Sequence, residues 1–312
     1  MADITVFGDG MSFFVPADTA TVYSLKADSG FYRSVNYELD WTGSNLVYNN
    51  ANTYQASGGV YTSFLLKDSH GASQIQVSNI AYAAQSGDVG FSAVISKLIA
   101  GNDNWTGTAA NETFELDLGN DSFNGKDGMD TLEVSVLKSS DYSVTKVGTG
   151  YQLKVVTLGT GISGQVDTLT SIERIKFADE VIALDTDGVA GKVYRLYQAA
   201  FDRIPDKAGL GYWIGHLDQG IENLTQVAAG FVNSVEFKKL YGDNISDNAF
   251  LTALYSNVLH RAPDQAGFDY WNGRVSDGMS RAGILASFNE SDENIAQVVG
   301  QMSHGIEFIP YG

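Results

Sequence analysis

The chain has 312 residues, of which 44% are hydrophobic, so it holds material for about two or three domains with cores of their own. Its 37 acidic and 19 basic residues give a net charge of −18, which argues against nucleic acid or an anionic membrane surface as a partner. The absence of cysteine excludes disulfides and cysteine-ligated zinc. No apolar run approaches the roughly 20 residues of a membrane span.

Residues 1–90 are rich in Tyr, Val, Thr and Ser, and they contain short alternating or apolar segments such as TVYSL, NLVY and SQIQVS. Gly-, Asp- and Asn-rich turn signals separate these segments. The pattern predicts an all-β domain over residues 1–90, either a sandwich or a small barrel. Residues 91–99 change to a helical period, which predicts a short helix that caps the segment after it.

Residues 101–136 consist of four nonapeptides laid end to end, GNDNWTGTA, ANETFELDL, GNDSFNGKD and GMDTLEVSV. Each begins with a small residue, namely Gly101, Ala110, Gly119 and Gly128. A carboxylate follows two places on, in Asp103, Glu112, Asp121 and Asp130. An apolar residue comes two places further, in Trp105, Phe114, Phe123 and Leu132. Such a short fixed period is typical of a solenoid, in which each turn stacks on a copy of itself.

We interpret each nonapeptide as half a coil, so that residues eighteen apart stack, Asp103 on Asp121 and Glu112 on Asp130. Like charges at the roughly 5 Å spacing of neighbouring strands repel unless a cation lies between them. Calcium suits that position because it mixes carboxylate ligands with the backbone carbonyls that Gly-rich loops expose. The predicted calcium ligands are Asp103, Glu112, Asp121, Asp127 and Asp130, with Gly101, Gly119 and Gly128 at the loop heads. The alternative is an acidic, Asn/Gly-rich loop region without metal.

The same segment resembles the haemolysin-type (RTX) calcium-binding repeat, G-G-x-G-x-D-x-U-x, where U is a large apolar residue. The match is best at Gly125, Gly128, Asp130 and Leu132. The second glycine of the pattern is replaced by Thr108, Asp117 and Lys126, and the second turn carries Ala110 and Glu112. The resemblance implies a short parallel β-roll that holds one or two calcium ions.

The N-terminus, MADITVFGDG, lacks a basic region followed by an apolar core, so we expect no cleaved signal peptide. Composition alone then favours the cytoplasm. RTX-like proteins, however, are typically exported by a type I machine that reads an uncleaved C-terminal signal, and the resemblance implies an extracellular protein. Without calcium, the carboxylates of the roll would repel one another. The millimolar calcium outside the cell would remove this repulsion and allow the roll to fold.

Further strands are predicted up to residue 188, which makes residues 91–188 a second domain of capping helix, roll and trailing strands. Residues 189–312 are rich in helix formers and contain a second repeat, with a spacing of 58 residues. Both copies carry the motif R-x-P-D-x-x-G-x-x-Y-W. Proline ends one helix, the following Asp caps the next, and the Tyr-Trp pair is expected to bury the hydrophobic face. We therefore predict a multidomain α+β protein with an all-α tandem repeat at its C-terminus.

The tandem repeat resembles an uncharacterised helical domain found at the C-terminal ends of RTX-like, S-layer-associated and other type I-secreted surface proteins. The resemblance implies a location rather than an activity. For Arg203 with Asp206, and Arg261 with Asp264, we favour a salt bridge plus helix cap over a binding site duplicated in each half.

No catalytic constellation is visible. The four histidines share no metal-ligand spacing, and the chain has no G-x-S-x-G elbow and no Walker loop, so we do not expect an enzyme. The favoured function is a secreted, calcium-binding structural protein of the bacterial cell surface or extracellular matrix that self-assembles into an S-layer-like sheet or filament. The alternatives are an adhesin whose N-terminal β domain binds a glycan, such as a cell-surface polysaccharide, or a host protein, and a secreted hydrolase.

Overall fold

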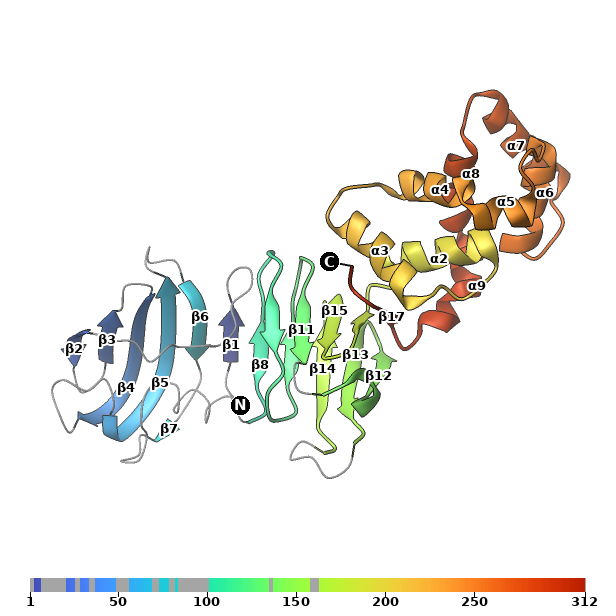
Figure 1. Ribbon diagram of the computed structural model, residues 1–312. Helices are drawn as coiled ribbons and strands as arrows, with labels where there is room; N and C mark the ends of the chain where they lie inside the picture. The colour runs from blue at the N-terminus through green and yellow to red at the C-terminus, as the bar shows by residue number, and fades with distance from the viewer. Residues whose placement is uncertain are drawn as a thin grey trace. The chain divides into compact units, whose positions relative to one another are not determined.

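Figure 1 shows the computed structural model of the chain. It describes residues 101–134, 137–157 and 163–311, and within residues 1–100 it describes the backbone of the strands β1–β7. The chain divides into two compact units, Met1–Ala178 and Asp179–Gly312. The finer division at residues 90 and 188 stays a prediction.

The first part of unit 1 is an antiparallel arrangement of strands. In sheet order these are β2 (Thr21–Leu25), β3 (Ser29–Arg33), β4 (Tyr37–Tyr48), β5 (Ala56–Asp68), β6 (Ser73–Ser78) and β1 (Asp3–Val6), with β7 (Tyr82–Ala83) paired to β5. Neighbours in this order pair antiparallel, and all but the pair of β6 with β1 are consecutive in the chain, as hairpin connections require. The β-rich character predicted for residues 1–90 is confirmed. The helix predicted at 91–99 lies outside the described residues.

Two sets of short parallel strands follow the antiparallel part. One set comprises β8 (Asn104–Thr106), β10 (Ser122–Asn124) and β14 (Val166–Thr170). The other comprises β9 (Thr113–Glu115), β11 (Thr131–Val134) and β15 (Arg174–Phe177). Their registers place Phe123 opposite Trp105 and Leu132 opposite Phe114. The predicted stacking of residues eighteen apart is therefore confirmed.

The apolar residues of the nonapeptides form a continuous interior. Phe123 is fully buried, and its ring lies 6.0 Å from that of Trp105 in a stacked arrangement and 5.8 Å from that of Phe114 edge-on. Beyond β14 the sheet continues antiparallel through β13 (Gly150–Val155) to β12 (Tyr142–Val147), which follows the short 3-10 helix η1 (Ser139–Asp141). This hairpin buries Leu153 and Val155.

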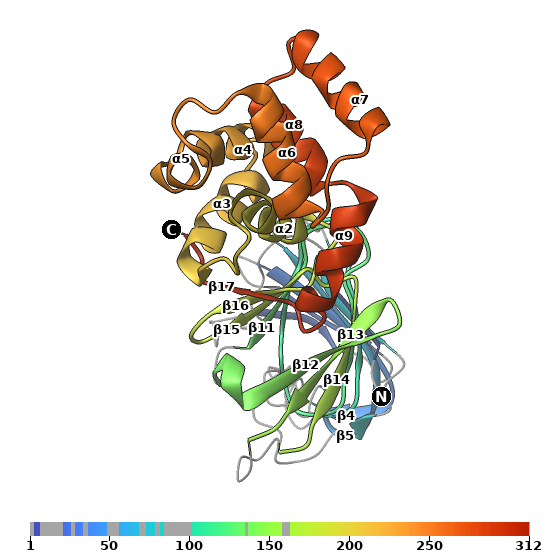
Figure 2. The same cartoon turned by 90° about the vertical axis from the view of Figure 1, so that its right-hand side faces the viewer.

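Unit 2 is mainly helical. Its described helices are α2 (Val189–Phe201), α3 (Lys207–Asp218), α4 (Leu224–Asn233), α5 (Val235–Tyr241), α6 (Asp247–Val258), α7 (Gln265–Ser276), α8 (Arg281–Asn289), α9 (Asp292–Val298) and the 3-10 helix η2 (Val299–Met302). The antiparallel strands β16 (Val181–Ala183) and β17 (Ile306–Phe308) complete the unit, and β17 packs against α2 and α3 (Figure 2). None of the helices in the described part of the chain is long and apolar enough to cross a membrane.

The doubled R-x-P-D-x-x-G motif builds the same turn twice. Asp206 caps α3 by accepting a hydrogen bond from the backbone N–H of Gly209 (2.7 Å), and Asp264 caps α7 in the same way through Gly267 (2.9 Å). A Cβ at Gly209 would lie 2.4 Å from the hydroxyl of Tyr197, so the glycine makes room for that ring. The cap that we favoured over a duplicated binding site is confirmed.

The arginines of the motif form their main ion pairs with glutamates outside it. Arg203 donates two hydrogen bonds to Glu236 (2.7 and 3.1 Å), and Arg261 donates two to Glu293 (2.8 and 3.0 Å). The contacts with the motif aspartates are longer, 3.9 Å to Asp206 and 3.3 Å to Asp264. The salt-bridge interpretation is therefore confirmed. In each copy, however, the arginine is closer to a glutamate outside the motif than to the motif aspartate.

We expected both rings of each Tyr-Trp pair to be buried, and this expectation is wrong. Trp271 packs against Phe288 with ring centroids 5.0 Å apart, whereas Tyr270 is 59% exposed. Consecutive residues on a helix point about 100° apart, so both rings cannot face one core. The tryptophan is the residue that packs inward, and Trp213 does the same against Phe231 in the first copy.

Candidate functional site

Six carboxylate side chains form two columns, one along each set of parallel strands. The first column is Asp103, Asp121 and Asp167, and the second column is Glu112, Asp130 and Glu173. All are at most 2% exposed except Glu173, which is half-buried. In each case the acid stands two places before a buried apolar residue. Because side chains at i and i+2 of an extended segment point to the same face, the sequence carries the acids inward with the core.

Backbone amides link the members of each column. In the first column, the N–H of Asp103 donates to Asp121 Oδ1 (2.8 Å), and the N–H of Asp121 donates to Asp167 Oδ1 (2.9 Å). In the second, the N–H of Glu112 donates to Asp130 Oδ1 (2.7 Å), and the N–H of Asp130 donates to Glu173 Oε2 (2.8 Å). Each turn is therefore held to the next through one oxygen of a carboxylate.

The second oxygen of two of these carboxylates has no hydrogen-bond donor. Asp121 Oδ2 and Asp130 Oδ2 are buried and receive no hydrogen bond from an amide or a hydroxyl, and neither do the two side-chain oxygens of Asp117. The polar neighbours of these oxygens are other carboxyls, Asp117 beside Asp121 and Glu112 beside Asp130. An unpaired buried carboxylate oxygen carries a desolvation cost of about 1–3 kcal/mol or more. The columns thus concentrate unsatisfied negative charge inside unit 1.

Burial and like charge shift the ionisation of these carboxyls upward. Burial raises the pKa of Asp130 to about 7, and the negative charges of Glu112 and Glu173 add to the effect. Burial also raises the pKa of Asp167 to about 7. The pKa of Asp117 is raised further, by burial first and then by the carboxylates of Asp121 and Asp103. Near neutral pH, the electrostatics of the columns alone favour partial protonation.

Glycines open oxygen-lined spaces beside the columns. A Cβ on Gly125 would lie 2.2 Å from both Asp130 Oδ2 and the carbonyl oxygen of Ser171. A Cβ on Gly107 would lie 2.4 Å from Glu112 Oε2 and 2.6 Å from the carbonyl oxygen of Gly125. At each point a carboxylate and a carbonyl from different turns face the same small space. Only glycine leaves that space open.

Two of the three predicted loop-head glycines, Gly119 and Gly128, are in left-handed backbone conformations, whereas Gly101 is not, and a Cβ there would meet nothing within 4 Å. Gly119 has φ 137° and Gly128 has φ 129°, and a Cβ on Gly119 would lie 1.8 Å from the carbonyl oxygen of Gly101. Glycine is therefore required at both positions. Lys126, at the position where the RTX pattern has its second glycine, is also left-handed, with φ 70°. It keeps the backbone shape that the pattern's glycine would have.

The structure brings together most of the side chains predicted to bind calcium, but not all. Asp103 and Asp121 lie in the first column, and Glu112 and Asp130 lie in the second. Asp127 is exposed at the tip of its loop. In the described part of the chain, no three His, Cys, Asp or Glu side chains are grouped as a metal site. Carboxylates here alternate with backbone groups instead of converging in threes.

Sequence reasoning missed three acids of this region, Asp117, Asp167 and Glu173. A signal for two of them was present, because Asp167-Thr-Leu169 and Glu173-Arg-Ile175 repeat the acid-x-apolar spacing of Asp121-Ser-Phe123. Asp117 carries no such signal, since it stands outside the acid positions of the nonapeptides. Gln165 adds to the first column by donating its amide to the carboxylate of Asp167 (3.1 Å) and to the carbonyl of Asp117 (2.9 Å).

Comparisons with known proteins bear on unit 2 only. Residues 192–241 and 228–298 match the family model described as "Domain of unknown function (DUF4214)". The family comparison gave no match to an RTX repeat. No curated protein and no solved structure matches the chain. The helical region of this chain is thus similar to a family defined by its sequence and not by an activity.

Proposed function

We propose that residues 101–178 form a short RTX-like β-roll that binds calcium, within a secreted structural protein of the bacterial cell surface or extracellular matrix. The observation that carries this proposal is the presence of two buried carboxylate oxygens without a donor, Asp121 Oδ2 and Asp130 Oδ2, in columns of stacked acids. The penalty for burying a charge is several kcal/mol per ion unless a partner compensates it. A cation is the partner that both columns lack.

The residues fit calcium better than other metals. The available ligand atoms are carboxylate and carbonyl oxygens, which hard cations prefer, and calcium accepts about 6–8 of them in flexible geometry. Magnesium demands a near-ideal octahedron, which is harder to obtain from atoms fixed in a solenoid. In the second column, Asp130 and Glu112 would supply carboxylate oxygens, and Ser171 and Gly125 would supply carbonyl oxygens. In the first column, Asp121 and Asp117 would supply the carboxylates.

Bound calcium would supply positive charge between the stacked acids and so remove the repulsion within each column. It would also stabilise the deprotonated forms of Asp117, Asp130 and Asp167, whose pKa values burial raises. Calcium binding is then coupled to folding of the roll, because the ligands come together only in the stacked form. Such a protein would stay less ordered at low cytosolic calcium and fold after export.

Self-assembly is the second part of the proposal. A net charge of −18 makes copies of the chain repel one another, and bound calcium reduces that charge by two for each ion. Assembly should therefore depend on calcium for two reasons, the order of the roll and the lowered repulsion. The helical domain, similar to one common in secreted surface proteins, is consistent with a location in a sheet or filament.

Two measurements on the purified chain test the proposal. Isothermal titration should show calcium binding in the micromolar to millimolar range, and the Asp121→Ala, Asp130→Ala double variant should lose it. An Asp127→Ala variant is the matched control, because Asp127 is exposed, and it should bind calcium within about twofold of the wild type.

Electron microscopy with and without calcium tests assembly. Ordered sheets or filaments should form in calcium and disperse in chelator. Dispersed single particles at high concentration in calcium would refute the assembly role, and an absence of calcium binding by the wild type would refute the metal.

A further inference from the structure

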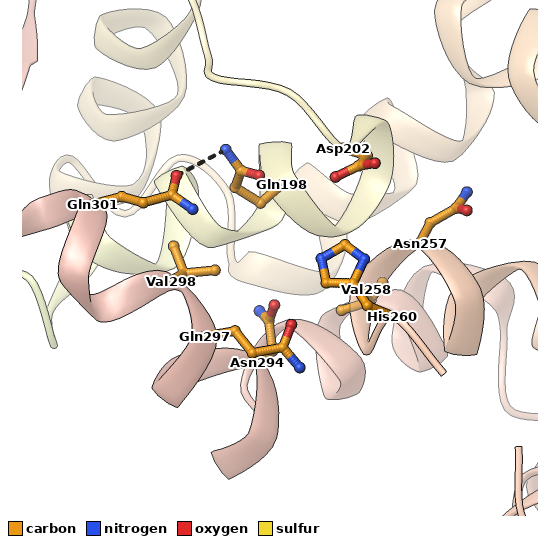
Figure 3. A pocket seen from close by; sticks show the side chains of 9 residues that line it. All are labelled: Gln198, Asp202, Asn257, Val258, His260, Asn294, Gln297, Val298 and Gln301. Carbon is orange, nitrogen blue, oxygen red and sulfur yellow. Dashed lines mark hydrogen bonds between the residues drawn. The ribbon is translucent and has the colours of Figure 1, made fainter. Parts of the chain in front are cut away.

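Unit 2 contains a cavity of about 340 Å³ where the two helical repeats meet. Its walls come from the C-terminal ends of α2 and α6, from α9 and from η2 (Figure 3). Five of the residues that line it carry side-chain amides, namely Gln198, Asn257, Asn294, Gln297 and Gln301. If this junction only held the helices together, apolar side chains would be expected at these positions. The amide side chains therefore suggest a second role for the cavity, such as binding a ligand.

The two repeats contribute equivalent positions to the cavity. Asp202 and His260 are separated by the 58-residue repeat spacing, and each stands immediately before the arginine of its motif. Asp202 directly follows α2, and His260 lies two residues after the end of α6. Both adopt left-handed backbone conformations, with φ 48° and φ 52°. A left-handed residue commonly ends a helix, and here it turns the chain after α2 and after α6 in the same way. The repeat thus aims one polar side chain from each copy toward the cavity.

Protein contacts fix the orientation of the amides. Asn257 donates its amide nitrogen to the hydroxyl of Tyr241 (3.1 Å), and Asn294 donates to the carbonyl of Asn289 (2.9 Å). Gln198 donates to Gln301 Oε1 (3.4 Å), a contact drawn in Figure 3. The side-chain nitrogens of Gln198, Asn257, Asn294 and Gln297 are engaged in this way. Gln301 differs, because its Oε1 accepts from Gln198 and from the hydroxyl of Tyr194 (3.2 Å). The amide oxygens of the first four and the carboxylate of Asp202 can act as acceptors, and the amide nitrogen of Gln301 can act as a donor. The cavity is therefore matched to a ligand whose polar groups both donate and accept hydrogen bonds, as hydroxyls do.

Two apolar side chains also line the cavity, Val258 and Val298, and both are at most 5% exposed. A lining that combines aliphatic side chains with amides and one carboxylate suits a pyranose ring, whose C–H face is apolar and whose hydroxyls donate and accept at the edge. We propose that this cavity binds the terminal one or two rings of a neutral saccharide.

Size and charge separate this ligand from other classes. The volume lies near the lower end of the roughly 300–1,000 Å³ of small-molecule pockets, which is large for a single metal ion. A polyamine would be expected to meet several carboxylates, whereas this lining contains one, Asp202. The site lies wholly within unit 2 and is independent of the calcium proposal. It places saccharide recognition in the helical repeat rather than in the N-terminal β region.

Saturation-transfer NMR on the full chain in calcium tests the proposal. The probes are glucose, galactose, mannose, N-acetylglucosamine, fucose and cellobiose, with spermidine as a cationic comparison. At least one saccharide should bind with a dissociation constant of about 1 mM or tighter, which corresponds to roughly −4 kcal/mol. Spermidine should give weaker saturation than that saccharide.

Two variants and one control locate the binding. Gln297→Trp would fill the cavity and should weaken the saccharide at least tenfold. Asp202→Asn tolerates the left-handed backbone and removes only the charge, so it should weaken binding about three- to tenfold. Ala296→Trp, on an exposed neighbour in α9 that does not line the cavity, should leave binding unchanged. Melting curves confirm that all three fold.

Three results would overturn the proposal. They are no binding of any of these saccharides by the wild type, binding that survives both Gln297→Trp and Asp202→Asn, and preferential binding of spermidine.

Discussion

The nonapeptide repeat and the helical repeat of this chain differ in how their charged side chains are paired. In residues 101–178, carboxylates of like sign stack inside the unit, and two of their oxygens have no donor. In unit 2, the charges of each repeat meet opposite charges, Arg203 with Glu236 and Arg261 with Glu293, and the buried Arg195 pairs with Glu290 (2.8 Å). The ion pairs of the helical repeat are formed within the chain, whereas for the short repeat we propose that a cation from outside the chain compensates the stacked carboxylates.

The length of the repeat explains why like charges stack in one region and opposite charges pair in the other. A nine-residue repeat that stacks on itself every eighteen residues places each acid on another acid, so repulsion is built into the register. The helical repeat is long enough for an arginine to reach a glutamate 32 or 33 residues later within the same copy. In this chain, the short period stacks like charges, and the long period allows opposite charges to meet.

The largest expected effect comes from pH, which acts on several column carboxyls at once. The pKa values of Asp130 and Asp167 are raised to about 7 in the folded chain, from an ordinary value of 3.8. Protonation thus favours the folded state, and that stability is lost as pH rises from about 4 through 7. In chelator, calorimetry should show the transition of unit 1 moving to lower temperature between pH 5 and pH 8.

The same titration in millimolar calcium should not lower that transition, because calcium competes with protons for the same oxygens. The transition of unit 2 serves as a comparison in the same scan, and the effect of its histidines is removed by comparing chelator with calcium at each pH. A unit 1 transition that is flat or rises with pH in chelator would contradict the assignment of repulsion to the columns.

Core truncation gives the next largest effect and identifies the transition of unit 1. Phe123→Ala removes a fully buried ring that contacts both Trp105 and Phe114, and it should cost about 3–5 kcal/mol in the free energy of unfolding. Leu118→Ala, at a position 51% exposed in the same segment, should cost no more than about 0.5 kcal/mol. Equal effects of the two changes in chemical denaturation would refute the interior proposed for the repeats.

Substitutions at two glycines, Gly125 and Gly101, test whether the oxygen-lined spaces bind calcium. Gly125→Ala places a methyl group against Asp130 Oδ2 and the carbonyl of Ser171, and it should destabilise unit 1 by about 1–3 kcal/mol and abolish calcium binding at the second column. Gly101→Ala meets nothing within 4 Å and should leave both properties unchanged. Titration calorimetry of both variants measures the difference. Normal calcium binding by Gly125→Ala would move the site elsewhere.

The smallest effect concerns the helical repeat. Asp206→Ala removes the cap of α3 and should cost about 1 kcal/mol, while Asp206→Asn keeps an equivalent cap and should cost only a few tenths of that. Neither change should alter the response to calcium. Thermal melts in calcium and in chelator test both statements, and a calcium-dependent effect of Asp206→Ala would contradict the independence of unit 2.

The sequence allowed the stacking of residues eighteen apart to be predicted, because a strict period leaves one stacking arrangement, but it did not show that the nonapeptide acids are buried. It did not reveal that Asp167 and Glu173 extend the columns. They lie 46 and 43 residues after their partners, since the β12–β13 hairpin interrupts the period between them. The glutamate partners of Arg203 and Arg261 were also missed, because packing of separate helices brings them together and no short motif records that contact.

Hydrogen exchange measured by mass spectrometry in calcium and in chelator tests the central claim most directly, because it reports each region separately. We predict that chelator removes protection from the amides of residues 101–134 and 163–178 and leaves residues 189–298 unchanged. In the Asp121→Ala, Asp130→Ala variant the two conditions should give the same low protection in the columns. Full protection of residues 101–134 in chelator would contradict a calcium-dependent roll.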